Sequence, residues 1–414
     1  MPAFTAPGPY TPGEIALQFL PLFSVALGYG AMLPVLPGML DRLHGASTDD
    51  VLPLHAGLLT GIYIGAFVIA APFWGRITDR RGPRGVLLAG LVGYAAATLW
   101  LGVAGSLVAV YALRFVAGAF AAGLVPATAA SIVVRCDESS RARHLGWMSA
   151  AAIGGFLVGP ALTGWVHGLL DASSVARTSP LHVTAVPIWA TGAVALASAL
   201  GIAWLFRPSQ TPHQRVDPVA QAGAGVRPHA RLGILFLSAL GAFGLGAFEV
   251  GLSLQSRQTW QLSPADLGWL FVMCSLVMLA IQVLLFDWLQ RELQPAVLVI
   301  CGFVLMTAGF AFMASATAYG VVMVLVAVIA LGSGVLLPTL NVVMVDKAGS
   351  AVGAAVGYQA AASNLGQAAG SAAIGLLFIV NPYVSFTFIA VAMLLAAVSA
   401  WILARLRGAR LSER

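Results

Sequence analysis

The sequence predicts an all-α membrane protein in which twelve transmembrane helices form two pseudo-symmetric six-helix bundles. Three observations lead to this prediction: an apolar composition, the spacing of the apolar runs and an internal repeat. Of the 414 residues, 59% are hydrophobic and only 9% are charged, whereas a soluble domain carries roughly 25% charged residues. Because so few charges cannot cover a surface in water, we expect the solvent of this chain to be lipid.

The charged residues lie mainly between apolar runs that are long enough to span a bilayer. A spanning helix needs about 20 mostly apolar residues. The predicted spans are 14–37, 53–75, 84–104, 106–134, 141–169, 186–206, 231–255, 264–288, 295–315, 318–345, 350–379 and 382–405. The first of these is expected to remain as a helix, because the residues before it lack the basic stretch of a cleavable signal peptide.

A pattern of glycines and one aromatic residue occurs twice. The first copy is Gly146-Trp147, Gly155, Gly159-Pro160 and Gly164, and the second, 211 positions later, is Gly357-Tyr358, Gly366, Gly370-Ser371 and Gly375. Small residues one turn apart let helix backbones approach closely. The repeat therefore predicts two homologous bundles, 1–206 and 231–414, and parallel six-helix repeats are a plan that transporters use.

The loops predict how the chain lies in the membrane. Residues 207–230 are polar and rich in Pro, Gly and Gln, which is typical of a flexible linker between halves. With alternate loops assigned to one side, seventeen Lys and Arg residues share the side of both termini, and only Arg42, Arg177 and Arg257 lie on the other. This asymmetry predicts cytoplasmic termini and linker, in a protein of the cytoplasmic (inner) membrane. The net charge of +6 is then an orientation signal, and no nucleic-acid partner is expected.

The segment between the second and third spans, from Gly75 to Arg84, reads GRITDRRGPR. It resembles the signature loop of the major facilitator superfamily, and together with the two six-helix halves this resemblance covers essentially the whole chain. The resemblance implies a conformational latch in which Asp79 accepts bonds at a neighbouring helix end. The latch residues would be Gly75, Asp79, Arg80, Gly82 and Arg84. A helix dipole and charge-assisted bonds make such a contact favourable. The alternative is a solvated basic turn.

Arg114 and Glu249 are ionisable residues placed within spans. A charge in the bilayer costs several kcal/mol unless it is paired or faces a cavity. The setting of Arg114 resembles the fourth-helix motif of the same superfamily, which implies a role in proton or substrate coupling; the alternative is a snorkelling arginine. Glu249 could bind and release a proton or attract a cationic substrate, and the alternative is a structural carboxylate.

The first copy of the glycine pattern differs from the second by a proline. Gly155, Gly159, Pro160 and Gly164 resemble the fifth-helix motif of antiporters in the major facilitator superfamily, which implies efflux. Proline removes a backbone hydrogen bond and favours a kink. The second copy has Ser371 instead, so we expect it to keep the close packing without the kink.

Several amides and tyrosines lie within the spans, where polar groups facing lipid are costly. Those considered as cavity lining are Tyr29, Gln255, Gln282, Asn341, Gln359 and Asn364. The alternative for each is a hydrogen bond that joins two helices. The sequence contains no GxxxxGK[ST] phosphate loop and no paired-His spacing, so neither nucleotide-driven transport nor a cofactor or metal is expected.

Together these features favour a secondary active transporter, most similar to the drug-proton antiporter branch of the superfamily. It would move a small organic molecule by alternating access, coupled to protons, and work as a monomer in the lipid bilayer. One alternative is a proton-coupled importer of a nutrient or siderophore. An alternative of another class is a membrane enzyme or receptor-like protein, but the spans show no convergent catalytic set.

Overall fold

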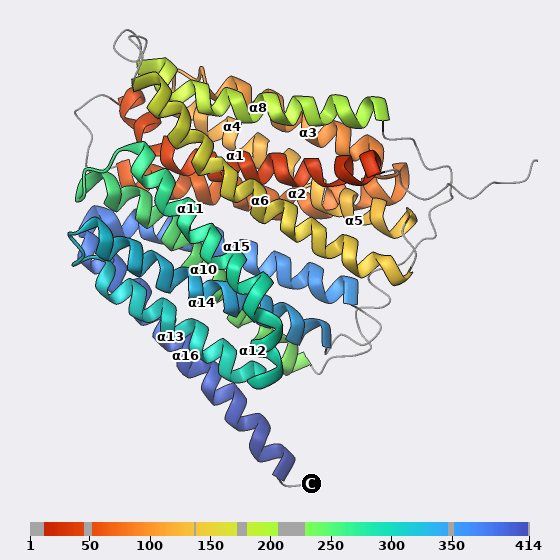
Figure 1. The fold of residues 1–414 in the computed structure, drawn as a ribbon, viewed down its shortest axis with the longest axis vertical. Helices are drawn as coiled ribbons and strands as arrows, with labels where there is room; N and C mark the ends of the chain where they lie inside the picture. Colours follow the sequence, from red (N-terminus) through yellow and green to blue (C-terminus); the bar gives the residue numbers. More distant parts are fainter. Residues whose placement is uncertain are drawn as a thin grey trace, which may run out of the picture. The chain divides into compact units, whose positions relative to one another are not determined.

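The computed structural model describes residues 12–44, 52–135, 138–171, 180–205, 228–346 and 352–412, and these residues are almost entirely helical (Figure 1). The helices of the first part are α1 (Pro12–His44), α2 (Leu52–Arg81), α3 (Pro83–Leu101), α4 (Leu107–Ala121), α5 (Leu124–Arg135), α6 (Glu138–Asp171) and α8 (Pro180–Leu205). Those that follow are α10 (Pro228–Gln258), α11 (Pro264–Ala280), a π-helical turn (Ile281–Leu285), α12 (Phe286–Glu292), α13 (Pro295–Met313), α14 (Tyr319–Asp346), α15 (Val352–Val380) and α16 (Pro382–Ser412).

The predicted number of spans is confirmed. Twelve stretches of the described helices are long and apolar enough to cross a membrane, and each overlaps one predicted span. The first one runs to Leu43, although the sequence predicts an end at residue 37. α1 continues through Pro34 and Pro37 because the residues around them, such as Leu36 and Met39, are fully buried. Apolar packing here outweighs the local preference of proline to end a helix.

Two spans predicted as continuous helices are interrupted. The fourth is divided at Ala122 and Gly123 into α4 and α5, where the backbone of Gly123 lies against the indole of Trp74. The eighth contains the π-helical turn between α11 and α12. Wide turns of this kind are rare and leave the regular hydrogen-bond ladder locally changed.

The chain divides into two compact units. Unit 1 comprises Met1–Leu43 and Gly65–Arg215, and unit 2 comprises His44–Ile64 and Val216–Arg414. The first part of α2 therefore packs with unit 2, where Gly57 lies against Gly375 of α15. Residues 44–64 belong to unit 2 in this division and to the first bundle in the sequence-based prediction. The boundaries 1–206 and 231–414 stay a prediction.

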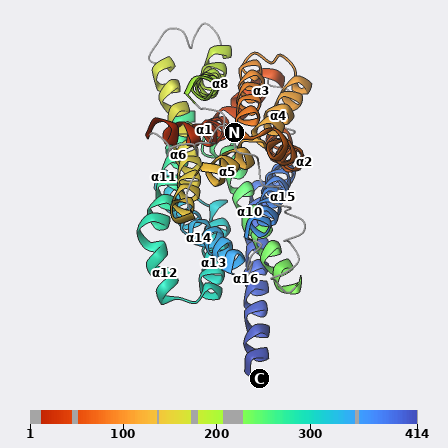
Figure 2. The ribbon, with the colours of Figure 1, turned by 90° about the vertical axis from the view of Figure 1, so that its right-hand side faces the viewer.

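The two copies of the glycine pattern pack in the same way inside their own units. In unit 1, a Cβ atom added to Gly155 or Gly159 of α6 would meet the backbone carbonyl of Phe23 or Leu27 on α1. In unit 2, Gly366 and Gly370 of α15 stand in the same relation to the carbonyls of Ala239 and Phe243 on α10. Figure 2 shows α15 beside α10. Each glycine thus allows two helix backbones to touch.

The facing helices repeat this relation from their own side. Gly30 of α1 packs against the backbone of Phe156 and the ring of Pro160, and Gly246 of α10 packs against the backbone of Gln367 and the hydroxyl of Ser371. The matching residues differ by 216 positions on α1 and α10 and by 211 on α6 and α15. These two offsets identify which residue of one unit corresponds to which residue of the other.

Candidate functional site

The clearest candidate site lies in unit 2, where Glu249 of α10 meets α15. The side chain of Glu249 is only 3% exposed. Its Oε2 atom accepts a hydrogen bond from Nε2 of Gln367 at 3.0 Å, and the thiol of Cys274 on α11 is close enough to interact electrostatically with it. A buried carboxylate needs such partners, because an uncompensated charge in an apolar interior is expensive.

The glycine face positions this pair of side chains. Gly246 precedes Glu249 by one helical turn, and a Cβ atom at Gly246 would lie 2.9 Å from the carbonyl carbon of Gln367. The contact is closed further by Ser371, whose Oγ donates to the carbonyl of Gly246 at 3.3 Å. Because the two backbones touch here, the amide group of Gln367 reaches the carboxylate of Glu249 directly.

The two positions of unit 1 that correspond to this polar pair carry apolar side chains. The offset of 216 places Leu33 at the position of Glu249, and the offset of 211 places Phe156 at that of Gln367. Leu33 is buried, and Phe156 packs against Tyr29 with ring centroids 6.0 Å apart. The same backbone framework therefore carries an apolar contact in one unit and a carboxylate–amide hydrogen bond in the other.

Arg114 lies in the interior of unit 1. It is 5% exposed and lines a small cavity with Tyr94, Thr98 and Thr191, among others. The guanidinium interacts electrostatically with Tyr94. The space, about 10 Å³, is roughly that of one water molecule. Arg114 thus shares a mainly apolar enclosure with three polar side chains from α3 and α8.

The segment from Gly75 to Arg84 comprises the end of α2, a sharp turn at Gly82 and the start of α3. Gly82 has a φ of 82°, a left-handed conformation that favours glycine, and its amide donates to the carbonyl of Thr78 at 2.9 Å. The Nη2 atom of Arg84 donates to the carbonyl of Ala203, near the end of α8, at 2.7 Å. Arg80 is exposed, and Gly75 has open space around it. The side chain of Asp79 lies outside the described residues.

Pro160 and its neighbours lie at the contact between α6 and α1. The pyrrolidine Cδ atom packs against Gly30, and the hydroxyl of Thr163 donates to the carbonyl of Ala31 at 3.0 Å. α6 is helical through Pro160 and Gly164 without interruption. The structure therefore brings the predicted fifth-helix motif onto the first helix.

The polar residues considered as cavity lining have different surroundings. Gln359 is buried, and its Nε2 atom donates to Ser238 on α10 at 3.1 Å, so it joins two helices. Gln255 is also buried. Tyr29, Gln282 and Asn364 are half-buried, and Asn341 is exposed.

Gln367 is an amide within the eleventh span, and the sequence alone did not pair it with Glu249. The signal that could have found it is the repeat itself. Gly30 and Gly246 are equivalent, and Gly30 faces Phe156, so Gly246 is expected to face the residue equivalent to Phe156, which is Gln367. Because Gly246 lies one turn before Glu249, a polar residue facing Gly246 is a direct candidate for the partner of Glu249.

Comparison with known proteins identifies the family to which the chain belongs. A family model described as Major Facilitator Superfamily matches residues 19–351 and 234–414. The chain is 26% identical over 379 residues to Multidrug resistance protein 2 of Bacillus subtilis (strain 168), covering 89% of each chain. It is 23% identical over 406 residues to Quinolone resistance protein NorA of Staphylococcus aureus (strain Mu50 / ATCC 700699), covering 97% of this chain and 99% of the relative.

Solved structures share the fold. A bacterial homolog to the human lysosomal transporter Spinster, in an inward-facing and occupied conformation, matches with a TM-score of 0.75 at 15% identity, covering 94% of this chain and 96% of its own. The human organic anion transporter MFSD10 (TETRAN) matches with a TM-score of 0.67 at 19% identity, covering 94% and 100%. Since the family model spans well over half of the chain, the protein belongs to the Major Facilitator Superfamily and is a membrane transporter.

Proposed function

We propose that the protein exports small, amphipathic organic molecules from the cytoplasm in exchange for protons. The observation that carries this proposal is the buried carboxylate of Glu249, held by Gln367 at the contact of α10 and α15. The names of the relatives, multidrug resistance and quinolone resistance proteins, support an organic substrate and the outward direction. The resemblance of the segment around Pro160 to an antiporter motif supports the same direction.

Exchange follows from the chemistry of one carboxylate that serves two ligands. In its charged form Glu249 accepts the hydrogen bond of Gln367 and attracts a cationic group of the substrate. When a proton binds, the carboxyl group becomes neutral and that attraction is lost. Proton and substrate therefore compete for one site, and competition at a site with alternating access exchanges one for the other.

The glycine contacts suit such a cycle. Where Gly246 meets Gln367 and Gly370 meets Phe243, the backbones of α10 and α15 lie directly against each other. A carboxylate that changes charge at this contact changes the strength of the bond between the two helices, because hydrogen bonds to charged groups are the stronger ones. In this way protonation of Glu249 alters the packing of the helix that carries it.

Transport by inside-out vesicles tests the proposal. Vesicles with an acidic lumen receive ethidium or a quinolone outside, and lumenal pH and substrate uptake are recorded. We expect substrate entry to release protons from the lumen, and Glu249→Gln to abolish the coupled proton release. Asp287→Asn, which removes an exposed carboxylate on α12, is the matched control and retains it. Normal coupled transport by Glu249→Gln would overturn the assignment.

The same assay separates export from import. A proton-coupled importer moves substrate and protons out of the lumen of inside-out vesicles in the same direction. An antiporter moves substrate into the lumen while protons leave it.

The proposal also includes cytoplasmic termini, a monomer in the cytoplasmic membrane, and the latch at Asp79. Protease cleavage of a C-terminal tag in inside-out vesicles, but not in right-side-out ones, is the expected result for that orientation.

A further inference from the structure

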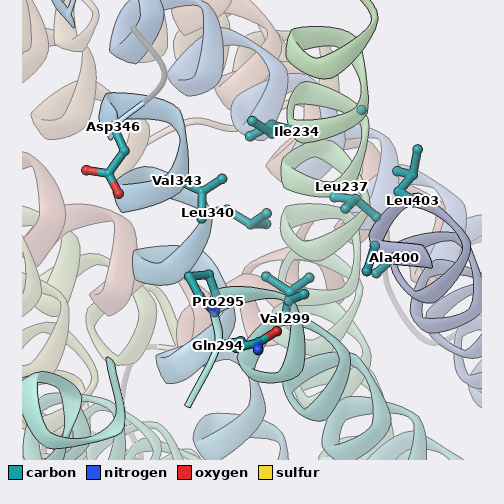
Figure 3. A pocket seen from close by; sticks show the side chains of 13 residues that line it. Ile234, Leu237, Gln294, Pro295, Val299, Leu340, Val343, Asp346, Ala400 and Leu403 are labelled. Carbon is teal, nitrogen blue, oxygen red and sulfur yellow. The ribbon is translucent and has the colours of Figure 1, made fainter. Parts of the chain in front are cut away.

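Unit 2 contains a cavity of about 400 Å³ between α10, α13, α14 and α16 (Figure 3). This volume lies within the range of small-molecule pockets, which is about 300–1,000 Å³. Its lining is mainly apolar and includes Ile234, Leu237, Val299, Leu340, Val343 and Leu403. The lining has two polar members, Gln294 and Asp346. Gln294 directly precedes α13, and Asp346 is the last residue of α14.

The internal repeat defines which residues of unit 1 correspond to this lining. α3 and α13 both have nineteen residues and both begin with proline. A Cβ atom added to Gly90 of α3 would meet Leu124, and one added to Gly302 of α13 would meet Leu336. These pairs are 212 positions apart. For α1 and α10 the offset is 216, as shown by Gly30 and Gly246.

Large side chains occupy the corresponding positions in unit 1. Arg84 corresponds to Ala296, and Leu17 corresponds to Gly233, both of which line the cavity. Arg84 crosses from α3 to α8 and donates to the carbonyl of Ala203, and Leu17 packs against Gly201 of α8. Unit 2 has an alanine and a glycine at these positions, so both large side chains are absent there.

The surrounding polarity also differs between the units. In unit 1, Gln18 donates to Ser131 at 3.1 Å. The corresponding residues of unit 2 are Ile234 and Val343, both in the cavity lining. The cavity of unit 2 thus lies where unit 1 has an arginine side chain, and its lining is more apolar than the corresponding residues of unit 1.

We propose that this cavity binds an amphipathic organic cation. The apolar body occupies the volume that Arg84 and Leu17 fill in unit 1, and the cationic group lies at the edge near Asp346. Asp346 is exposed, and among the described residues its carboxylate has no hydrogen-bond partner. Asp346 is the one charged residue of the cavity lining.

This site is separate from the one assigned to transport. Leu237, the lining residue of α10 nearest to Glu249 in sequence, precedes it by 12 positions, or about 18 Å along a helix. A transporter without this second site would still exchange protons through Glu249.

Photolabelling of the full-length protein in phosphatidylcholine nanodiscs tests the proposal. The probe is an aryl diazirine with a trimethylammonium group, compared with its uncharged tert-butyl isostere, and labelled peptides are mapped by mass spectrometry. We expect the cation to label the segments Gly233–Leu237, Gln294–Val299 and Leu340–Asp346 about fivefold more than the isostere. Asp346→Asn should remove this preference, since a partly exposed ion pair contributes about 1 kcal/mol, or about fivefold in affinity. The control Asp287→Asn should keep it.

A second variant restores the side chain of unit 1. Ala296→Arg is expected to fill the cavity and reduce labelling of these segments at least tenfold, and a cooperative thermal transition shows that the variant is folded. Val297→Phe, at the next position and exposed, adds volume outside the cavity and should leave labelling unchanged. Equal labelling by the cation and the isostere, unaffected by Asp346→Asn, would show a cavity that takes lipid and would overturn the proposal. So would undiminished labelling of folded Ala296→Arg.

Discussion

Adding one methyl group to the contact between α15 and α10 tests how tightly the two helices are packed. In Gly370→Ala the new Cβ atom would lie 2.7 Å from the carbonyl carbon of Phe243 and 2.9 Å from its Cα, whereas ordinary contact begins at 3.4 Å. The carbonyl oxygen of Phe243 is nearer still, and because this obstacle is backbone and cannot rotate away, the two helices must move apart. Overpacking of this kind costs typically about 1–3 kcal/mol.

The matched control is on the same helix. Gly357→Ala adds the same methyl group where no atom lies within 4 Å. Both substitutions gain the same intrinsic preference of alanine for helix, about 1 kcal/mol over glycine, so this contribution cancels between them. The difference in stability is therefore about 1–3 kcal/mol, with Gly370→Ala the less stable.

The assay is unfolding of the purified protein in a mild detergent, followed by circular dichroism against temperature and denaturant. The transition midpoint of Gly370→Ala is expected below that of the unmodified protein, and that of Gly357→Ala at or above it. Unit 1 offers the same comparison between neighbours: Gly155 lies against the carbonyl of Phe23, and Gly154 has open space around it. Equal stability of the two alanine variants in either unit would refute close backbone packing as the role of this face.

Three further substitutions have defined outcomes. Gln367→Leu removes the donor to Glu249 at 3.0 Å. A hydrogen bond to a charged group contributes about 1.5–3 kcal/mol, so the free energy of unfolding is expected to fall by about this amount. Unchanged stability would show that the amide does not hold the carboxylate. Gly82→Ala forces an L-residue into φ 82° and ψ 162°, a region almost restricted to glycine, and should cost about 1–3 kcal/mol in thermal unfolding. Gly85→Ala, in open space, should cost nothing. Equal losses would contradict the role of the turn. Arg84→Leu removes the hydrogen bond to the carbonyl of Ala203 near the end of α8 and should lower the free energy of unfolding by about 1.5–3 kcal/mol. Arg80→Leu, at an exposed arginine of α2, should lower it less.

The contrast between Gln367 and Gly366 shows how far sequence reasoning extends. Gly366 belongs to a pattern that is visible along one helix, and its contact with Ala239 follows the close packing that the pattern predicts. The role of Gln367 depends on a residue 118 positions away and on the rotation of α10 about its axis. Apolar periodicity does not fix that rotation when both helices are apolar on nearly every face.

The sequence by itself determined the twelve spans and the faces on which helices approach most closely. Both properties are local, because entry into lipid depends on the hydropathy of about 20 successive residues and close approach depends on glycines one turn apart. Only the tertiary structure decided that α1 continues to His44, that Glu249 pairs with Gln367, and that Arg84 reaches α8. It also decided that two small residues in unit 2, Ala296 and Gly233, leave a cavity. Such features arise from side chains of several helices that meet in one place, and their combined volume and polarity appear only when the helices are packed.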